Sequence, residues 1–502
     1  MITDFAMIGN NETISLDDIP AVSFEEFRDA VIEAIENRAR LSALPVHRFG
    51  PSGELRVIAV LSFPERAELG VISSPVPDPW PSLTPECPAA HWFEREIAEQ
   101  WGVNVTGHPW LKPIRFQPSR RAPIGDSDRP SIGLTDFFEI SGPESHEVAV
   151  GPVHAGVIEP GHFRFLCHGE TVYHLEISLG YQHRGVEAAM LGGPTPRSVH
   201  YMETLAGDTT IGHTTAYSQV REALAGVLAP ARGESIRAIA AELERMANHI
   251  GDLGAIAGDV GFLPTMNYCG RIRGEVLNMT AAICGNRFGR GLVRPGGVQW
   301  DLDAKLVEDL LKRLEAVEKD ITGAVTLMLN TPSVLARLEG TGVVSAGTAR
   351  RIGLVGPAAR ASGLDRHVCA DFPYGIYRLV QVPVSTWTGG DCFARTYVRW
   401  LEVQKSMDFL REELGEVPMG PLDRELPPIK PNALAISLVE GWRGEICHVA
   451  ATDSEGHFSL YKVVDPSFHN WFGLALALRG QQISDFPLCN KSFNLSYCGH
   501  DL

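Results

Sequence analysis

The pattern of apolar and polar positions predicts a chain of mixed helices and strands. Apolar side chains recur at helical spacing over residues 21–41, and the continuous apolar run at 55–63 is typical of a buried strand. Two longer amphipathic patterns follow, at 234–258 and about 304–325, each with one apolar stripe opposite a charged face. The C-terminal quarter returns to short strand-like segments around a turn at 453–456. The sequence therefore predicts an α+β fold.

One segment, from Gln117 to Pro130, has charge, proline and glycine but no hydrophobic period, as linkers do. We expect a domain boundary there. The predicted organisation is an N-terminal α+β domain at 1–117, a linker at 118–146, and a mainly helical domain with small β pieces at 147–502.

Composition narrows the possible classes of protein. The 502 residues carry 44 Lys and Arg against 61 Asp and Glu, a net charge of -17, which argues against nucleic acid as a partner. None of the nine cysteines lies in a C-x-x-C pair, so zinc ribbons and cysteine-bound iron–sulfur clusters lack their usual signature. No apolar run approaches the roughly 18 residues of a membrane-spanning helix, and no secretory signal is recognisable. We expect a cytoplasmic location.

Several segments, in their order and spacing, resemble one superfamily. It comprises the large subunits of energy-converting (group 4) nickel–iron hydrogenases, of the formate hydrogenlyase and hydrogenase-4 type, and the homologous subunits of respiratory complex I. Residues 92–116 resemble the end of the complex I 30-kDa subunit, which these hydrogenase proteins carry fused to their N-terminus. The rest resembles the 49-kDa subunit and the hydrogenase large subunit proper. The segments that carry this second resemblance begin at Gly151, Gly169, Glu242, Gly285, Ala359 and Asp465.

The hydrogenases hold nickel and iron with four cysteine thiolates from two C-x-x-C pairs, which are soft ligands suited to these metals. The resemblance places the first pair at Ala206 and Thr209 and the second at Ser496 and Gly499. All four thiolates are therefore missing, and we expect no nickel–iron centre. Cys498 lies one residue from a ligand position and Cys489 nine residues before it, which leaves open a hydrogenase with atypical ligands; free thiols packed in the core are the simpler interpretation.

Complex I relatives use the same cavity for a quinone, with a histidine and a tyrosine as polar partners of its headgroup. The resemblance places the histidine at His162 and the tyrosine on or beside Gly207, so half of the pair is present. Glu159 lies in a stretch that resembles a hydrogenase motif with a proton-transferring glutamate. The candidate proton and acceptor pocket is therefore Glu159, His162, Asp208 and His213, with His162 and His213 as candidate quinone ligands.

Other polar residues of these segments have a structural interpretation. We expect Arg184, Glu244 and Asn248 to tie helices together, because buried polar groups must be hydrogen-bonded. The glycines of residues 285–291 follow a helical pattern, so they do not indicate a phosphate-binding loop. The C-terminal aromatic residues could face a membrane partner, although a core position is more usual; they are Phe468, Trp471, Phe472, Phe486, Phe493 and Tyr497.

The resemblance implies a peripheral subunit, on the cytoplasmic side, of a membrane-bound complex related to hydrogenases and to NADH:quinone oxidoreductases. Such a complex performs NAD- or hydrogen-linked electron transport and couples electron transfer, here to a quinone-like acceptor, to ion translocation. Its expected partners are a small subunit that carries an iron–sulfur cluster, and antiporter-like and other integral membrane subunits. The alternative from a different class is a redox-inactive scaffold of the same complex.

Overall fold

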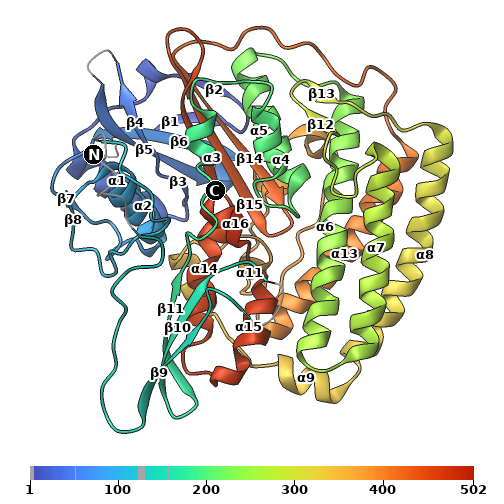
Figure 1. Cartoon of the computed structure of the whole chain (residues 1–502). Coiled ribbons are helices and arrows are strands. Elements are labelled where there is room, and N and C mark those ends of the chain that lie inside the picture. The colour runs from blue at the N-terminus through green and yellow to red at the C-terminus, as the bar shows by residue number, and fades with distance from the viewer. Residues whose placement is uncertain (1–4, 51–52, 122–130, 155–157) are drawn as a thin grey trace.

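The N-terminal part of the chain forms a five-stranded antiparallel sheet with order β1-β6-β5-β3 and β4 beside β5. The computed structural model, drawn in Figure 1, describes residues 5–50, 53–121, 131–154 and 158–502. The strands are β1 (Ala6–Gly9), β3 (Arg40–Ala43), β4 (Val46–Phe49), β5 (Glu54–Phe63) and β6 (Glu68–Pro75). The apolar run predicted as a buried strand is β5.

Helix α1 (Phe24–Glu36) covers this sheet and shows why the N-terminal pattern is helical. Ser23 and Glu26 form a capping box that fixes its start. Phe27, Ala30, Val31 and Ala34 are buried at three- and four-residue steps. Helix α2 (His91–Trp101) follows, beside the short parallel pair β7 (Trp80–Pro81) and β8 (Val105–Thr106).

A second, four-stranded sheet lies in the middle of the molecule, with order β16-β15-β14-β2. Its long strands are β14 (Ala433–Gly441), β15 (Gly444–Thr452) and β16 (Phe458–Val464). Every residue of β14 and β15 is buried, which explains the nearly continuous apolar runs at these positions. The edge strand β2 (Thr13–Ser15) pairs with β14, so the N-terminal residues contribute to both sheets.

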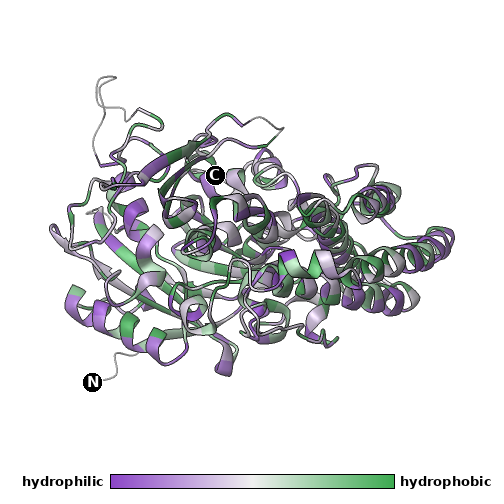
Figure 2. Cartoon of the chain, turned by 90° about the horizontal axis from the view of Figure 1, so that it is seen from below, coloured by the Kyte–Doolittle hydropathy of each residue, from purple (hydrophilic) through white to green (hydrophobic). Residues whose placement is uncertain are grey.

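Four long helices stand beside the central sheet (Figure 1). Helix α6 packs against α7 and α13, and α7 packs against α8. Figure 2 shows that these helices carry apolar and polar faces along their length. Their bounds are Ala231–Asp259 for α6, Leu263–Cys284 for α7, Ala304–Leu329 for α8 and Cys392–Gly415 for α13. The helices predicted at 234–258 and 304–325 are α6 and α8.

The remaining elements are short. Three antiparallel strands, β9 (Ser145–Val150), β10 (His162–His168) and β11 (Thr171–Ser178), form a hairpin sheet, and β12 (Val293–Arg294) pairs with β13 (Gly297–Val298). The other α-helices are α3 (Val186–Met190), α4 (Ser198–Glu203), α5 (Thr210–Ala225), α9 (Pro332–Leu338), α10 (Ala346–Arg351), α11 (Gly356–Arg360), α12 (Val368–Asp371), α14 (Pro466–Ala477), α15 (Phe486–Phe493) and α16 (Tyr497–Asp501). Single 3-10 turns lie at Leu16–Asp18, Pro64–Arg66, Pro88–Ala90, Gly375–Arg378 and Ile483–Asp485.

The α+β prediction is confirmed, with an α+β N-terminal part and a mainly helical remainder. Residues 122–130 of the predicted linker lie outside the described residues. The described residues 131–144 form no helix or strand, strand β9 begins at Ser145, and the domain boundaries stay a prediction. In the part of the chain that is described, no helix is both long and apolar enough to cross a membrane. The C-terminal aromatic side chains pack in the main core or against it.

Candidate functional site

The loop before α5 holds Asp208 in a two-pronged ion pair with Arg443. The two guanidinium nitrogens lie 2.7 and 2.8 Å from the carboxylate oxygens. The Asp208 carbonyl accepts a hydrogen bond from the indole of Trp442 at 3.0 Å. Burial alone would raise the pKa of Asp208, but the charge of Arg443 outweighs it and lowers this pKa below its usual range. Asp208 is therefore held as a carboxylate beside a fixed cation.

One turn into α5, His213 belongs to a fully buried chain of hydrogen bonds. Its Nε2 lies 3.0 Å from Oδ2 of Asp465, and its Nδ1 lies 3.1 Å from Nε2 of His448. Nδ1 of His448 in turn lies 2.9 Å from the Tyr461 hydroxyl. We call Asp465, His213, His448 and Tyr461 the histidine chain. It runs from α5 to strands β15 and β16 of the central sheet.

The protonation states along the histidine chain follow from burial and neighbours. Burial holds the pKa of His448 well below, and that of Tyr461 well above, the usual values, so both side chains are neutral. Burial would also raise the pKa of Asp465, but its hydrogen bond with His213 reverses the direction and lowers it. The chain thus has an ionised end and a neutral end, joined by two imidazoles that can each accept and donate a proton.

The last helix of the protein, α16, begins directly against Asp465. The Ser496 hydroxyl caps α16 by accepting a hydrogen bond from the Gly499 amide at 2.9 Å. A β-carbon on Gly499 would lie 2.7 Å from the Asp465 carboxylate. Asp465 therefore lies between His213 of α5 and Gly499 of α16, and it connects the two segments that contain residues 206–209 and 496–499.

Glu159 joins this group through the thiol of Cys498. Burial first, and then the charge and a hydrogen bond of Glu159, raise the pKa of Cys498 to about 11. The same thiol lies 3.4 Å from the Ser496 hydroxyl and contacts the backbone amide of Gly207. Glu159, which is half-buried, thus reaches the loop that carries Asp208.

His162, at the start of β10, has different neighbours. Its Nδ1 lies 3.2 Å from the Gly151 carbonyl oxygen, and its ring lies 5.0 Å from that of Phe137. Its buried Nε2 has no hydrogen-bond partner among the described residues. Contacts therefore bring Glu159, Asp208 and His213 to the junction of α5 and α16, whereas no described hydrogen bond connects His162 to that group.

Polar residues of α6 fix the start of α5. Glu244 accepts hydrogen bonds from the Ile211 and Gly212 amides at 2.7 and 3.2 Å, and burial raises its pKa to about 8. Asn248 donates to the Asp208 carbonyl at 2.9 Å. Arg184 donates to carbonyls at the end of α4. The structural roles expected of Glu244 and Asn248 are confirmed by these contacts. Arg184 is exposed, against the expectation of a buried residue, and it connects the loop before α3 to the end of α4.

Comparison with known proteins supplies the family. Residues 29–123 match the family described as "Respiratory-chain NADH dehydrogenase, 30 Kd subunit", and residues 259–434 match the corresponding 49 Kd subunit. The chain is 30% identical over 437 residues to formate hydrogenlyase subunit 5 of Escherichia coli. The aligned region covers 83% of this chain and 76% of that protein. It belongs to the family of group 4 hydrogenase large subunits and complex I 30- and 49-kDa subunits.

Two more relatives show both branches of this family. The carbon monoxide-induced hydrogenase of Rhodospirillum rubrum is 30% identical to the chain, with 70% of the chain and 97% of that protein covered. NADH-quinone oxidoreductase subunit 4 of Thermus thermophilus is also 30% identical, with 67% and 89% covered. The N-terminal 30-kDa-type part and the 49-kDa-type part are thus fused in one chain, as expected.

Cys489 and Cys498, the two cysteines near the family's second ligand pair, have separate surroundings. Cys489 lies with its sulfur 3.9 Å from that of Cys392, in the packed contact of α15 with α13. This sulfur–sulfur contact is the main reason why the pKa of Cys392 falls to about 6. Cys498 instead contacts Glu159 and Ser496. Within the described residues, no three His, Cys, Asp or Glu side chains are arranged to hold a metal ion.

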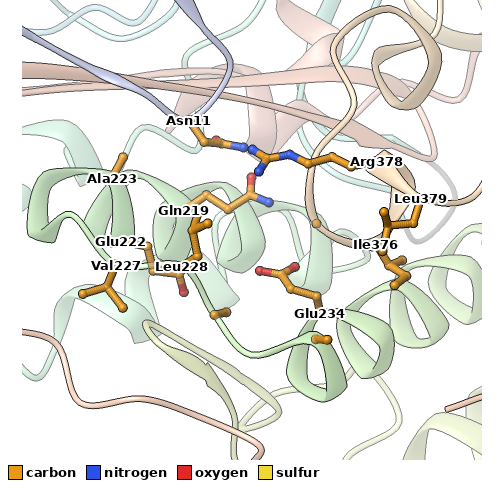
Figure 3. A pocket seen from close by; sticks show the side chains of 13 residues that line it. Asn11, Gln219, Glu222, Ala223, Val227, Leu228, Glu234, Ile376, Arg378 and Leu379 are labelled. Carbon is orange, nitrogen blue, oxygen red and sulfur yellow. The ribbon is translucent and has the colours of Figure 1, made fainter. Parts of the chain in front are cut away.

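A cavity of about 190 Å³ opens near the other end of α5 (Figure 3). Figure 3 shows the side chains of Gln219, Glu234 and Arg378 directed into it from three elements, with Asn11 beside the Arg378 guanidinium. None of Glu159, His162, Asp208 and His213 lines it.

The sequence did not identify four residues of the site. Asp465, His448, Tyr461 and Arg443 occupy no motif that marks them as polar partners; only Asp465 lies at the start of a segment that carries the resemblance. Each acquires its neighbour through the fold, because His213 is 235 residues from His448 and 252 from Asp465.

Proposed function

We propose that this chain is a peripheral, cytoplasm-facing subunit of a membrane-bound complex related to group 4 hydrogenases and complex I. In this proposal the complex couples electron transfer to ion translocation, and the chain contributes titratable groups but no nickel–iron centre. The relatives support it by their names, which describe hydrogenases and NADH-quinone oxidoreductase subunits.

The residues at the junction of α5 and α16 do not fit a nickel–iron centre. Ala206 and Gly499 have no donor atom. The Thr209 hydroxyl is hydrogen-bonded to Asp208 at 3.1 Å, and the Ser496 hydroxyl caps α16. Hydroxyl oxygens are hard ligands, whereas this metal pair is held by soft thiolates. The observation that carries the proposal is the Asp465 carboxylate, which fills the space next to Gly499 where a ligand side chain would begin.

The remaining groups suit proton handling. Glu159 shares a hydrogen bond with the Cys498 thiol, and the histidine chain begins at Asp465, beside the next residue, Gly499. Each imidazole of that chain can take a proton on one nitrogen and release one from the other. A relay of this kind needs neutral, hydrogen-bonded carriers, and His448 and Tyr461 are kept neutral by burial.

An acceptor such as a quinone would meet His162 separately from these groups. Nε2 of His162 is buried and has no partner among the described residues, so in this proposal the side chains that cover it move aside for the carbonyl or hydroxyl of the acceptor, and Phe137 supplies an aromatic surface beside it. In this proposal an iron–sulfur small subunit supplies the electron, and antiporter-like and other integral membrane subunits move the ion.

The tight Asp208–Arg443 pair supports a second candidate, a redox-inactive scaffold. A doubly hydrogen-bonded ion pair at the start of α5, reinforced by Trp442 and Asn248, holds helices together without any redox chemistry. The two candidates differ in one measurable respect, which is whether activity per assembled complex depends on Glu159 and His162.

The test uses the complex purified from native membranes, with Glu159→Gln and His162→Ala introduced separately. We expect each variant to assemble normally but to lose most electron transfer or coupled ion movement, normalised to assembled complex. Glu25→Gln, at an exposed position of α1, is the matched control and should behave as the wild type. Unchanged normalised activity in both variants would contradict the proposal and favour the scaffold.

A further inference from the structure

A larger cavity, of about 740 Å³, lies between the N-terminal part of the chain, the segment around α10, and α14. Its walls include His91 of α2, Trp110 of the following loop, and Phe472 of α14. None of Glu159, His162, Asp208 and His213 lines it. Its volume falls in the range of about 300–1,000 Å³ that is usual for small-molecule sites.

The walls are aromatic. The ring of Phe472 lies 4.8 Å from that of His91 and 6.0 Å from that of Trp110. Phe138 and His174 continue the same surface, at 5.6 and 5.4 Å from Trp110. Flat ring surfaces of this kind bind planar ligands by stacking and by loss of apolar area to water.

His91 lies in this wall, and neighbouring side chains cover both of its ring nitrogens. It is 3% exposed, yet neither Nδ1 nor Nε2 has a hydrogen-bond partner among the described residues. Burial holds its pKa well below the usual value, so the ring is neutral, with one nitrogen to donate and one to accept. A buried polar atom without a partner costs about 1–3 kcal/mol.

The charge of the cavity is positive, in a protein of net charge -17. Arg351 and Arg479 line it and are exposed, and no Asp or Glu is among the described residues that line it. Burial is the main cause that lowers the pKa of His174, and the positive charge of Arg479 is the second. The two guanidinium groups match a carboxylate or a phosphate group.

We propose that this cavity binds a planar aromatic anion. The ring of the ligand lies against Trp110 and Phe472, and Arg351 and Arg479 bind its carboxylate or phosphate group. The site is distinct from the junction of α5 and α16, and it does not depend on whether that junction handles protons.

The test measures binding of three probes to the full-length chain by calorimetric titration. The probes are 2-naphthoate, 2-naphthyl phosphate and the neutral 2-naphthylmethanol. We expect saturable binding of at least one anion at one site per chain, at least 10-fold tighter than that of the alcohol. The preferred anion then distinguishes a carboxylate from a phosphate ligand. Absence of saturable anion binding, or equal binding of the alcohol, would overturn the proposal.

Arginine variants test which side chains bind the anion. Arg351→Gln combined with Arg479→Gln should weaken binding of the preferred anion at least 10-fold and leave binding of the alcohol unchanged. Arg66→Gln, at an exposed arginine in the turn between β5 and β6, should change neither. A double variant that binds like the wild type would refute the anion site. Circular dichroism confirms that each variant is folded. If the isolated chain binds the anion but the assembled complex does not, the proposal is also overturned, and the cavity is identified as a binding surface for a partner subunit.

Discussion

The carboxylate of Asp465 occupies the space in which any side chain at position 499 would begin. A β-carbon built on Gly499 lies 2.7 Å from Cγ and Oδ2 of Asp465, closer than real β-carbons approach other atoms. Asp465 cannot easily withdraw, because His213 holds Oδ2 at 3.0 Å and the Ser467 amide holds Oδ1 at 2.8 Å. Glycine at 499 and aspartate at 465 are therefore mutually dependent.

This relationship predicts that Gly499→Cys destabilises the protein instead of restoring a ligand. The new side chain must displace Asp465 and break its hydrogen bond with His213, which should lower the free energy of unfolding by about 1–3 kcal/mol. Denaturant unfolding measures the change. Gly270→Ala in α7 is the control, since its β-carbon meets nothing within 4 Å; it should stabilise the helix by about 0.5–1 kcal/mol. A Gly499→Cys protein as stable as the wild type would contradict the fixed position of Asp465.

Loss of the Asp208–Arg443 ion pair should lower the free energy of unfolding by an intermediate amount. The Arg443 side chain is 5% exposed but that of Asp208 is 33% exposed, so water partly screens the pair. We expect Asp208→Asn to cost about 1–3 kcal/mol, less than the loss of a fully buried partner. The double variant with Arg443→Met should cost less than the sum of the single changes, which a double-mutant cycle measures. Glu308→Gln, in an exposed pair with Lys312, should leave the free energy of unfolding as in the wild type, because water screens the pair. Additive costs for Asp208 and Arg443 would show that they do not interact.

Sequence patterns predicted the amphipathic helices and the apolar run of β5, but they missed the buried helix α5 and the short strand β2. Helix α6 was expected at 234–258 and spans Ala231–Asp259, because one face is apolar and the other is not. Helix α5 has no such stripe: 13 of its residues, from both faces, are buried between the central sheet and its neighbours, and several are threonines. Strand β2 has three residues, too few for any period.

The residues of the candidate site also fall into those that the sequence could indicate and those that it could not. Asp208 and His213 could be found through the family resemblance, since they lie in one continuous segment. Their partners Arg443, Asp465 and His448 could not, because each contact joins segments more than 230 residues apart. No local pattern records a contact that only the packing of α5 on the central sheet creates.

Glu244 predicts a specific dependence of stability on pH. Its pKa is about 8 in the folded protein against an ordinary value near 4.5, with burial as the main cause. Between these values the folded state keeps a proton that the unfolded state has released, so this group's contribution to stability falls as pH rises from about 5 to 8. Glu244→Gln cannot titrate. The variant should therefore lose less stability over this range, by at least about 1 kcal/mol.

Unfolding of wild type and variant at pH 5 and pH 8 measures this difference. Glu25→Gln, at an exposed position of α1, is the control and should leave the pH dependence as in the wild type. Parallel pH profiles for the wild type and Glu244→Gln would mean that Glu244 is ionised throughout, and that the amides of Ile211 and Gly212 stabilise the carboxylate more than burial opposes it.

The last prediction concerns metal content. Because Ala206, Thr209, Ser496 and Gly499 offer no thiolate, and because Asp465 fills the space beside Gly499, the native complex should contain no stoichiometric nickel in this chain. It should neither consume nor produce hydrogen. Elemental analysis after chelator treatment, together with hydrogen-dependent dye reduction, measures both properties on the same preparation. About one nickel per chain that survives chelation, accompanied by hydrogen-dependent reduction, would show that atypical ligands such as Cys498 and Glu159 hold a metal. Nickel without that activity, if it is removed by chelator, would reflect surface binding and leave the prediction intact.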